Sequence, residues 1–185
     1  MILLRHGQSE FNLLFTQTRK DPGIIDPVLT TLGHEQATAA AVALAEEDIR
    51  RIVVSPYRRA IQTALPAAQR LGLPLTVTPV VRERYAFTCD IGSPRTALAQ
   101  DFPSVDFEHL DEVWWPPEEE PADQVEGRAS LFRAEMAALD DWAHTLVVSH
   151  WGFIMALTGL SVTNGQILRV DPTAPGPATV PWKHP

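Results

Sequence analysis

The chain has 185 residues, of which 45% are hydrophobic and 21% charged, and its formal net charge is −8. This composition is typical of a folded globular protein with one sizeable core. The negative charge argues against nucleic acid and anionic lipid as partners, because both are bound through basic patches. A single cysteine, Cys89, excludes an internal disulfide and a cysteine-rich zinc site, and no apolar run is long enough to span a membrane.

The chain opens on strand residues without the basic segment and cleavage site of a signal peptide, so we expect a cytoplasmic protein. We expect a single domain over residues 1–171, in which residues 86–121 form a lid or specificity insert. A loose, proline-rich tail should follow over residues 172–185. The expected fold class is α/β, a three-layer sandwich whose mostly parallel central sheet carries helices on both faces. Whether the chain forms a homodimer is left open.

The first element is an apolar run, residues 1–4, which predicts a buried strand. Arg5 and His6 follow it directly, and Gly7 lets the backbone turn beside the imidazole. In an open parallel sheet the carboxyl ends of the strands face the ligand crevice. An arginine next to a histidine there indicates an anion site with a nucleophile or base. The alternative is a charged strand end without function.

Residues 13–29 lack periodicity and contain turn signals, which predicts a loop that is either a plain connector or a wall of the pocket. Thr30 is expected to cap an alanine-rich helix, and residues 51–55 to form the second strand. Ser55-Pro56 should start the next helix, which ends at Gly72. Two arginines, Arg58 and Arg59, occupy its first turn. The helix dipole disfavours cations at this end, so they indicate a phosphate site unless they are simply solvated.

An extended segment over residues 75–81 precedes Glu83, which lies between two arginines, a pattern that is common in surface ion-pair clusters. Within the insert we expect a short helix over residues 94–100 and a solvated charge run at residues 118–120. Trp114 and Trp115 should pack inside this insert or line the substrate wall.

The pattern of an apolar strand followed by a histidine, seen at residues 1–6, occurs again near the end of the chain. A helix is predicted over residues 122–142, and an apolar strand over residues 145–149 then delivers His150 to its carboxyl end. Two strand-end histidines in such a sheet can face one crevice. A short helix over residues 153–160 and a strand over residues 166–170 complete the expected fold.

These residues resemble the histidine phosphatase superfamily, the phosphoglycerate-mutase-like group. Its Arg-His-Gly-x-(Ser/Thr)-x-x-Asn signature is met by Arg5, His6, Gly7, Ser9 and Asn12. The pattern Leu29-Thr30-x-x-Gly33-x-x-Gln36-Ala37, the pattern Ser55-Pro56-x-x-Arg59-Ala60-x-Gln62-Thr63-Ala64, the Arg-Glu pair at Glu83 and the final His150 also match, in the family's order. The sequence departs from the family at Trp151, which stands where the family has glycine and should narrow the pocket or stack in it.

The resemblance implies a phosphatase that acts on a small phosphate monoester through a phosphohistidine on His6. Arg5, Arg59 and, if protonated, His150 would stabilise the transferring group, and Glu83 would act as acid and then as base. The expected substrate-binding residues are Gly7, Gln8, Ser9, Asn12 and Trp151. No cofactor and no metal ion is expected, since the arginines supply the positive charge. Three alternatives remain: phosphoglycerate-mutase-type transfer, a non-catalytic phospholigand-binding module, and an unrelated flavodoxin-like binding domain.

Overall fold

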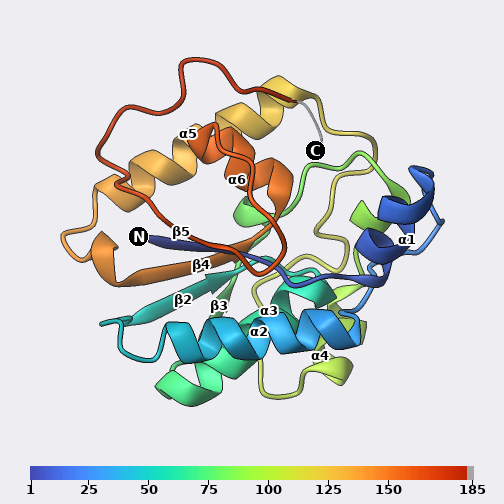
Figure 1. Cartoon of the computed structure of the whole chain (residues 1–185), viewed down its shortest axis with the longest axis horizontal. Helices are drawn as coiled ribbons and strands as arrows, with labels where there is room; N and C mark the ends of the chain where they lie inside the picture. The colour runs from blue at the N-terminus through green and yellow to red at the C-terminus, as the bar shows by residue number, and fades with distance from the viewer. Residues whose placement is uncertain (183–185) are drawn as a thin grey trace.

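The computed structural model describes residues 1–182, which form a three-layer α/β sandwich (Figure 1). Within these residues the central sheet has five strands in the order β3-β2-β4-β1-β5. The strands are β1 (Ile2–Arg5), β2 (Arg51–Val54), β3 (Leu75–Val77), β4 (Thr145–Ser149) and β5 (Ile167–Arg169). The first four run parallel, and β5 pairs antiparallel with β1 at the edge. The prediction of a mostly parallel sheet with helices on both faces is confirmed.

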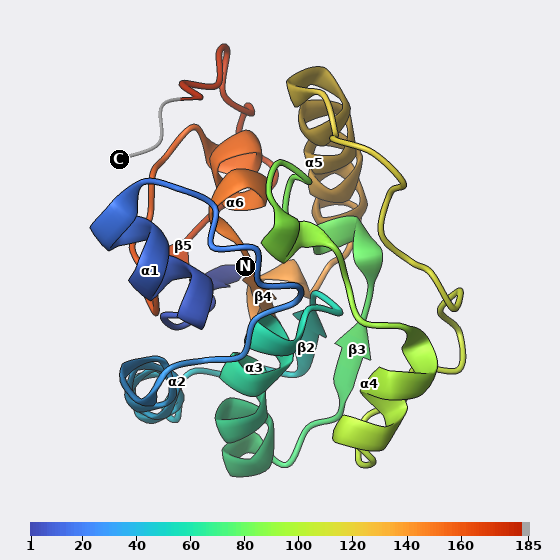
Figure 2. The same ribbon diagram turned by 90° about the vertical axis from the view of Figure 1, so that its right-hand side faces the viewer.

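The helices cover the two faces of the sheet in pairs. One face carries α2 (Thr31–Ala43) and α3 (Arg58–Leu71), and the other α5 (Ala122–Ala137) and α6 (Trp151–Thr158) (Figure 1). Figure 2, turned by 90°, shows α1 (Glu10–Thr18) and α4 (Arg95–Asp101) at the end of the sheet where the parallel strands stop. Three short 3₁₀ turns complete the order: η1 (Pro79–Val81), η2 (Thr88–Asp90) and η3 (Trp142–His144).

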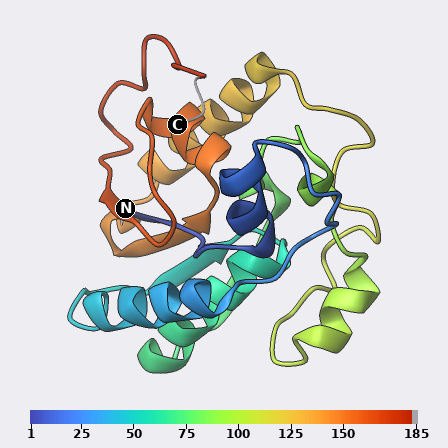
Figure 3. The same cartoon turned by 45° about the vertical axis from the view of Figure 1, so that its right-hand side comes forward.

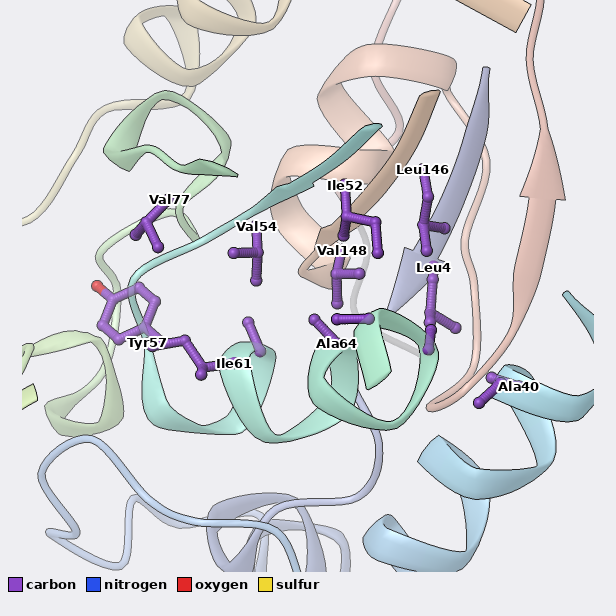
Figure 4. Packing of buried hydrophobic residues seen from close by; sticks show 14 of the residues in the cluster. Leu4, Ala40, Ile52, Val54, Tyr57, Ile61, Ala64, Val77, Leu146 and Val148 are labelled. Atoms are coloured by element: carbon purple, nitrogen blue, oxygen red, sulfur yellow. The ribbon is translucent and has the colours of Figure 1, made fainter. Parts of the chain in front are cut away.

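The strand side chains alternate between two apolar clusters, as the period of two along a strand requires. In β1, Leu4 belongs to the cluster beneath α2 and α3, whereas Leu3 belongs to the cluster beneath α5 and α6. Figure 4 shows Leu4 beside Leu146 and Val148, facing the α3 side chains. Full burial of such a leucine stabilises the fold by roughly 1.5–3 kcal/mol. Both faces of the sheet are therefore covered by apolar clusters, and the candidate histidines lie at the ends of its strands.

Helix α1 differs from the loop expected from residue 13 onward. It starts behind a capping box, in which Asn12 N donates to Ser9 Oγ at 3.3 Å and Ser9 N donates to Asn12 Oδ1 at 3.1 Å. Phe11 is its one buried residue, so the apolar periodicity that normally predicts a helix is nearly absent. The helix stands over the end of the sheet and does not cover a face of the core.

The start of α3 also differs from the prediction. Tyr57, not Ser55, is the N-cap residue, and the first N–H of the helix, that of Arg58, donates to Asp26 Oδ1 at 3.1 Å. The helix therefore begins at Arg58, and Ser55 is left to bond elsewhere. The other end is as expected, since Gly72 terminates the helix with a φ of 66°, a left-handed conformation that glycine adopts without strain.

The insert is partly as predicted. The short helix is present as α4, and Trp114 is buried against Tyr57 with its ring centroid 4.7 Å away. The expected solvated charge run is wrong at Glu120, which is buried and forms ion pairs of 2.7 Å with both Arg82 and Arg128. These pairs join the insert to η1 and α5, and distant partners of this kind leave no trace in the local sequence.

The last described residues cross the outside of the protein near α6. In this segment, where a loose tail is predicted, Trp182 donates from Nε1 to Glu126 Oε1 at 2.7 Å and lies under the guanidinium of Arg84 at 5.1 Å. Among residues 1–182 no helix has both the length and the apolar character needed to cross a membrane.

Candidate active site

Two histidines meet where β1 and β4 end. These strands are parallel neighbours in which Arg5 aligns with Ser149, so the next residues, His6 and His150, emerge at the same level. The His6 N–H donates to Ser149 O at 2.9 Å, and the two imidazole centroids lie 5.0 Å apart. The sheet register therefore brings together two side chains that are 144 positions apart in the sequence.

His6 is held in one tautomer. Its Nδ1 lies 2.7 Å from Gly7 O, and because a carbonyl can only accept, the proton resides on Nδ1. Nε2 then keeps its lone pair. Burial, followed by the charges of Arg59 and Arg5, places the pKa of His6 well below its usual value. The imidazole is consequently neutral at neutral pH, the state that a nucleophile requires.

Two buried arginines approach the His6 imidazole from β1 and α3. Arg5 donates to Val162 O at 2.6 Å, while its Nε has no partner within residues 1–182. Arg59 donates to Cys89 O at 2.8 Å and to Asp90 Oδ1 at 3.0 Å. Burial lowers the pKa of Arg5 to about 10, which still leaves it charged at neutral pH. Two cations beside a neutral imidazole form a strong anion site.

The two arginines at the start of α3 have separate environments. Arg59 is 3% exposed and packs 4.3 Å from the centroid of the Tyr57 ring. Arg58 turns to the surface, where it pairs with Asp101 at 2.5 Å. Successive helical residues point about 100° apart, so only one of two neighbours can face the site.

Glu83 enters from the segment after η1. Its Oε1 accepts hydrogen bonds from Gly152 N at 2.8 Å and Arg84 N at 2.9 Å. Burial of the carboxyl group, followed by the negative charge of Asp90, raises the pKa of Glu83 to about 7. Gly152 is required here, because a Cβ at that position would lie 2.4 Å from Glu83 Oε1. Glu83 can thus hold or release a proton near neutral pH.

His150 is positioned by Ser55, the residue that sequence patterns assign to a helix cap. His150 Nε2 lies 2.7 Å from Ser55 Oγ, and the ring stands edge-on to Tyr57. Its Nδ1 is buried and has no partner among the described residues. When Ser55 Oγ donates to Nε2, Nδ1 carries the proton and is available to a ligand. Burial, then the charge of Arg59, lowers the pKa of His150 well below its usual value, so this imidazole is neutral at neutral pH.

Four of these side chains, those of Arg5, His6, Arg59 and Glu83, line one cavity of about 490 Å³, and His150 lies behind His6. We call the five residues the catalytic floor. The family described as histidine phosphatase superfamily, branch 1, matches residues 1–174 of this chain. The chain belongs to the histidine phosphatase superfamily. The resemblance noted in the sequence is confirmed.

Similar proteins of the superfamily include a glucosyl-3-phosphoglycerate phosphatase of Mycolicibacterium vanbaalenii, which is 31% identical over 180 residues, 91% of this chain and 78% of that protein. The native structure of a mycobacterial glucosyl-3-phosphoglycerate phosphatase has a TM-score of 0.58 and 30% identity, over 85% of this chain and 76% of that one. Its complex with inorganic phosphate has a TM-score of 0.56 and 29% identity, over 85% and 75%.

Only some of the predicted substrate-binding residues of this superfamily member line the cavity. Ser9, Asn12 and Trp151 line the cavity. Gln8 does not, because its Oε1 accepts from Thr30 Oγ1 at 2.9 Å. Gly7 N is also engaged, since it donates to Thr63 Oγ1 at 3.0 Å. The backbone N–H of Gly7, an expected substrate-binding residue, is therefore not available to a phosphate.

Two residues of the site were missed by sequence reasoning. Asp90 is fully buried, pairs with Arg59, and accepts from Ala86 N and Phe87 N at 3.1 Å each. Asn164 donates from Nδ2 to His6 O at 3.1 Å and to Asn12 Oδ1 at 3.1 Å. A lone aspartate in an irregular insert gave no signal, and Asn164 lies in a turn just before β5.

No group of three or more histidine, cysteine, aspartate or glutamate side chains within residues 1–182 gathers as a metal site would require. The positive charge of the described site resides instead on Arg5 and Arg59. Metal independence stays a prediction to be tested with a chelator.

Proposed function

We propose that this chain is a phosphatase that hydrolyses a small phosphate monoester through a phosphohistidine formed on His6. The observation that carries the proposal is the 2.7 Å hydrogen bond between His6 Nδ1 and Gly7 O, which leaves Nε2 unprotonated beside two buried arginines. A lone pair in a cationic pocket matches the needs of phosphoryl transfer, where the enzyme mainly positions and stabilises charge.

In the first step His6 Nε2 attacks phosphorus and the ester P–O bond breaks. The oxygen of the leaving alcohol takes the proton of Glu83, whose pKa of about 7 keeps a large protonated fraction at neutral pH. Arg5 and Arg59 stabilise the negative charge on the phosphoryl oxygens. Arg5 Nε, which has no partner among the described residues, is a donor that a bound phosphoryl group would satisfy.

In the second step the Glu83 carboxylate takes a proton from water, and the hydroxide oxygen bonds to phosphorus as the P–N bond breaks. Inorganic phosphate leaves, His6 regains its lone pair and Glu83 its proton, so the cycle is balanced without any other reactant. The metal-independent character and the cytoplasmic location that we expect belong to the same proposal. So does the absence of nucleic-acid and lipid partners, for which the charge of −8 is the support.

The test is hydrolysis of p-nitrophenyl phosphate in the presence of EDTA, by the wild type and by His6→Ala. We expect turnover in the wild type and a loss of about 10⁴-fold or more in the variant, because no other group can form the intermediate. Rapid quenching with ³²P-labelled substrate should trap an acid-labile, base-stable phosphoprotein in the wild type alone. His34→Ala is the matched control, since His34 is exposed at the start of α2, away from the cavity.

The two alternatives give different outcomes. Isomerisation of 3-phosphoglycerate in the presence of 2,3-bisphosphoglycerate, without release of phosphate, would support the mutase. Phosphate binding without turnover of any ester would support a binding module and overturn the phosphatase.

A further inference from the structure

Above the catalytic floor, the walls of the cavity are aromatic. Five rings line this part, and we call it the aromatic chamber: Phe11, Phe15, Phe87, Trp151 and Trp182. They come from α1, the segment before η2, the start of α6 and the last described residues of the chain. Figure 3 shows α1 beside both α6 and the green segment that precedes α4. In the proposed function the phosphoryl group occupies only the floor, so the rest of the substrate would enter this chamber.

One wall is a cluster of three phenylalanines. The Phe11 and Phe15 rings stack at 5.2 Å, and Phe87 lies 5.5 Å from Phe11 and 5.2 Å from Phe15. Phe15 and Phe87 are only half-buried, although each could have packed into a core. Apolar rings that line a pocket are characteristic of a ligand site.

The other wall is a pair of tryptophans with centroids 6.4 Å apart. Both indole N–H groups are already used, by Ser161 Oγ at 3.0 Å for Trp151 and by Glu126 Oε1 at 2.7 Å for Trp182. The tryptophans therefore offer a ligand ring surface and no hydrogen bond. Arg84 stacks on Trp182 and donates its Nε–H to Glu120 O at 3.0 Å, which fixes this wall.

Several polar side chains of the lining are already bonded within the protein. Asn164 is bonded to backbone and to Asn12, and the Thr163 hydroxyl contacts Gln166 at 3.2 Å. Of the acidic lining residues, Glu83 belongs to the floor and Asp90 pairs with Arg59, whereas Arg19 and Arg84 add positive charge to the lining. Cations attract the phosphate dianion during approach, whereas the rings receive what the phosphate is attached to.

We propose that the aromatic chamber selects phosphate monoesters whose alcohol carries an apolar ring, in preference to esters of polar sugar acids. This inference rests on the proposed phosphatase function and names its substrate class. The similar mycobacterial proteins are named for a glucosylated phosphoglycerate, so the chamber predicts a different selectivity for this chain.

The experiment compares kcat/KM for 2-phenylethyl phosphate with that for 3-phosphoglycerate. Both are esters of primary alcohols, so differences in leaving-group chemistry are small. We expect 2-phenylethyl phosphate to be preferred by about tenfold or more, since a buried ring contributes at least that much to binding. Equal values, or a preference for 3-phosphoglycerate, would overturn the inference and leave the phosphatase intact.

Variants test whether the preference comes from the chamber. Phe15→Ser and Trp182→Ala should each reduce it about tenfold, chiefly by raising KM for 2-phenylethyl phosphate, while Phe15→Leu should retain most of it. Leu14→Ser is the matched control, because Leu14 precedes Phe15 on α1 but is exposed and does not line the cavity. An unchanged preference in both Phe15→Ser and Trp182→Ala would show that the chamber does not select the substrate.

A binding measurement separates the two proposals. Calorimetric titration with 2-phenylethylphosphonate, which cannot be hydrolysed, should give tighter binding than 3-phosphonopropionate, and Phe15→Ser should remove the difference. That result, together with failure to hydrolyse any ester, would support the chamber and overturn the phosphatase. Equal binding of the two phosphonates would overturn the chamber even if esters are hydrolysed.

Discussion

The catalytic floor and the aromatic chamber share one cavity but are built from different kinds of elements. The floor histidines stand at strand ends whose register fixes them within 5.0 Å of each other, and its buried charges are held by specific partners. The chamber is assembled from α1, the segment before η2, the start of α6 and the last described residues, none of which belongs to the sheet. A rigid sheet can hold reacting atoms in place, whereas peripheral segments can vary what surrounds them. Changes in the floor should therefore alter kcat, and changes in the chamber should alter KM.

Among changes in the catalytic floor, Arg59→Ala should cause the largest loss of kcat/KM. Loss of this cation removes stabilisation of the transferring group, and we expect kcat/KM to fall about a thousandfold. The matched control is its neighbour Arg58→Ala, which removes only a surface pair with Asp101 and should change kcat/KM by no more than about threefold. Similar losses in both variants would mean that the separation of the two arginines has no catalytic consequence.

Asp90→Asn tests whether this residue acts through its neighbours. The carboxylate accepts from Arg59 on one oxygen and from two backbone N–H groups on the other, and an amide cannot accept on both sides. We expect kcat/KM at pH 7 to fall roughly tenfold. Asp90 also raises the pKa of Glu83, so its neutralisation should move the alkaline limb of the pH profile to lower pH.

A purely structural role for Asp90 would reduce activity without moving that limb. Asp101→Asn is the control, because Asp101 is exposed and pairs only with Arg58 in the described contacts.

Glu83→Gln should lower activity and raise the thermal stability of the protein at pH 8. The folded protein binds the Glu83 proton more tightly than the unfolded chain, because its pKa rises from 4.5 to about 7. The contribution of this group to the free energy of unfolding is thus fully present below pH 4.5 and is lost as the pH rises through about 7. The total contribution lost is about 3 kcal/mol. The amide oxygen still accepts from Gly152 and Arg84, so the variant should have a higher Tm than the wild type at pH 8 and a similar Tm at pH 4.5.

Thermal unfolding at the two pH values measures this directly. Glu119→Gln, at an exposed position in the insert, should show no such pH dependence. A Glu83→Gln protein that is less stable at pH 8 would contradict the elevated pKa.

The sequence predicts the floor better than it predicts the chamber, for physical reasons. Strand ends can be located because an apolar run stops abruptly at Arg5 or His150, and parallel pairing then brings them together. Ser55 and Asp90 could not be assigned, because their partners lie 95 and 31 positions away and hydrogen bonding at such range leaves no local pattern.

Helix α1 illustrates why the chamber was hard to predict. A helix that covers a pocket and not a core exposes both polar and apolar residues, so its periodicity is weak. Its capping pair, Ser9 and Asn12, was the available signal, and the family motif drew both residues into a substrate-binding interpretation. Trp182 was likewise placed in a tail predicted to be loose, although it lines the cavity.

The absence of a side chain at Gly152 affects how fast the proposed reaction can proceed as well as where Glu83 can lie. The Glu83 carboxylate sits where a methyl group on residue 152 would be, and in the proposed cycle this carboxylate must activate the water that cleaves the P–N bond. A methyl group on residue 152 would push the Glu83 side chain aside without moving the backbone beneath it. In the proposed cycle, glycine at position 152 therefore keeps the phosphoenzyme short-lived, because a larger side chain would displace the Glu83 carboxylate.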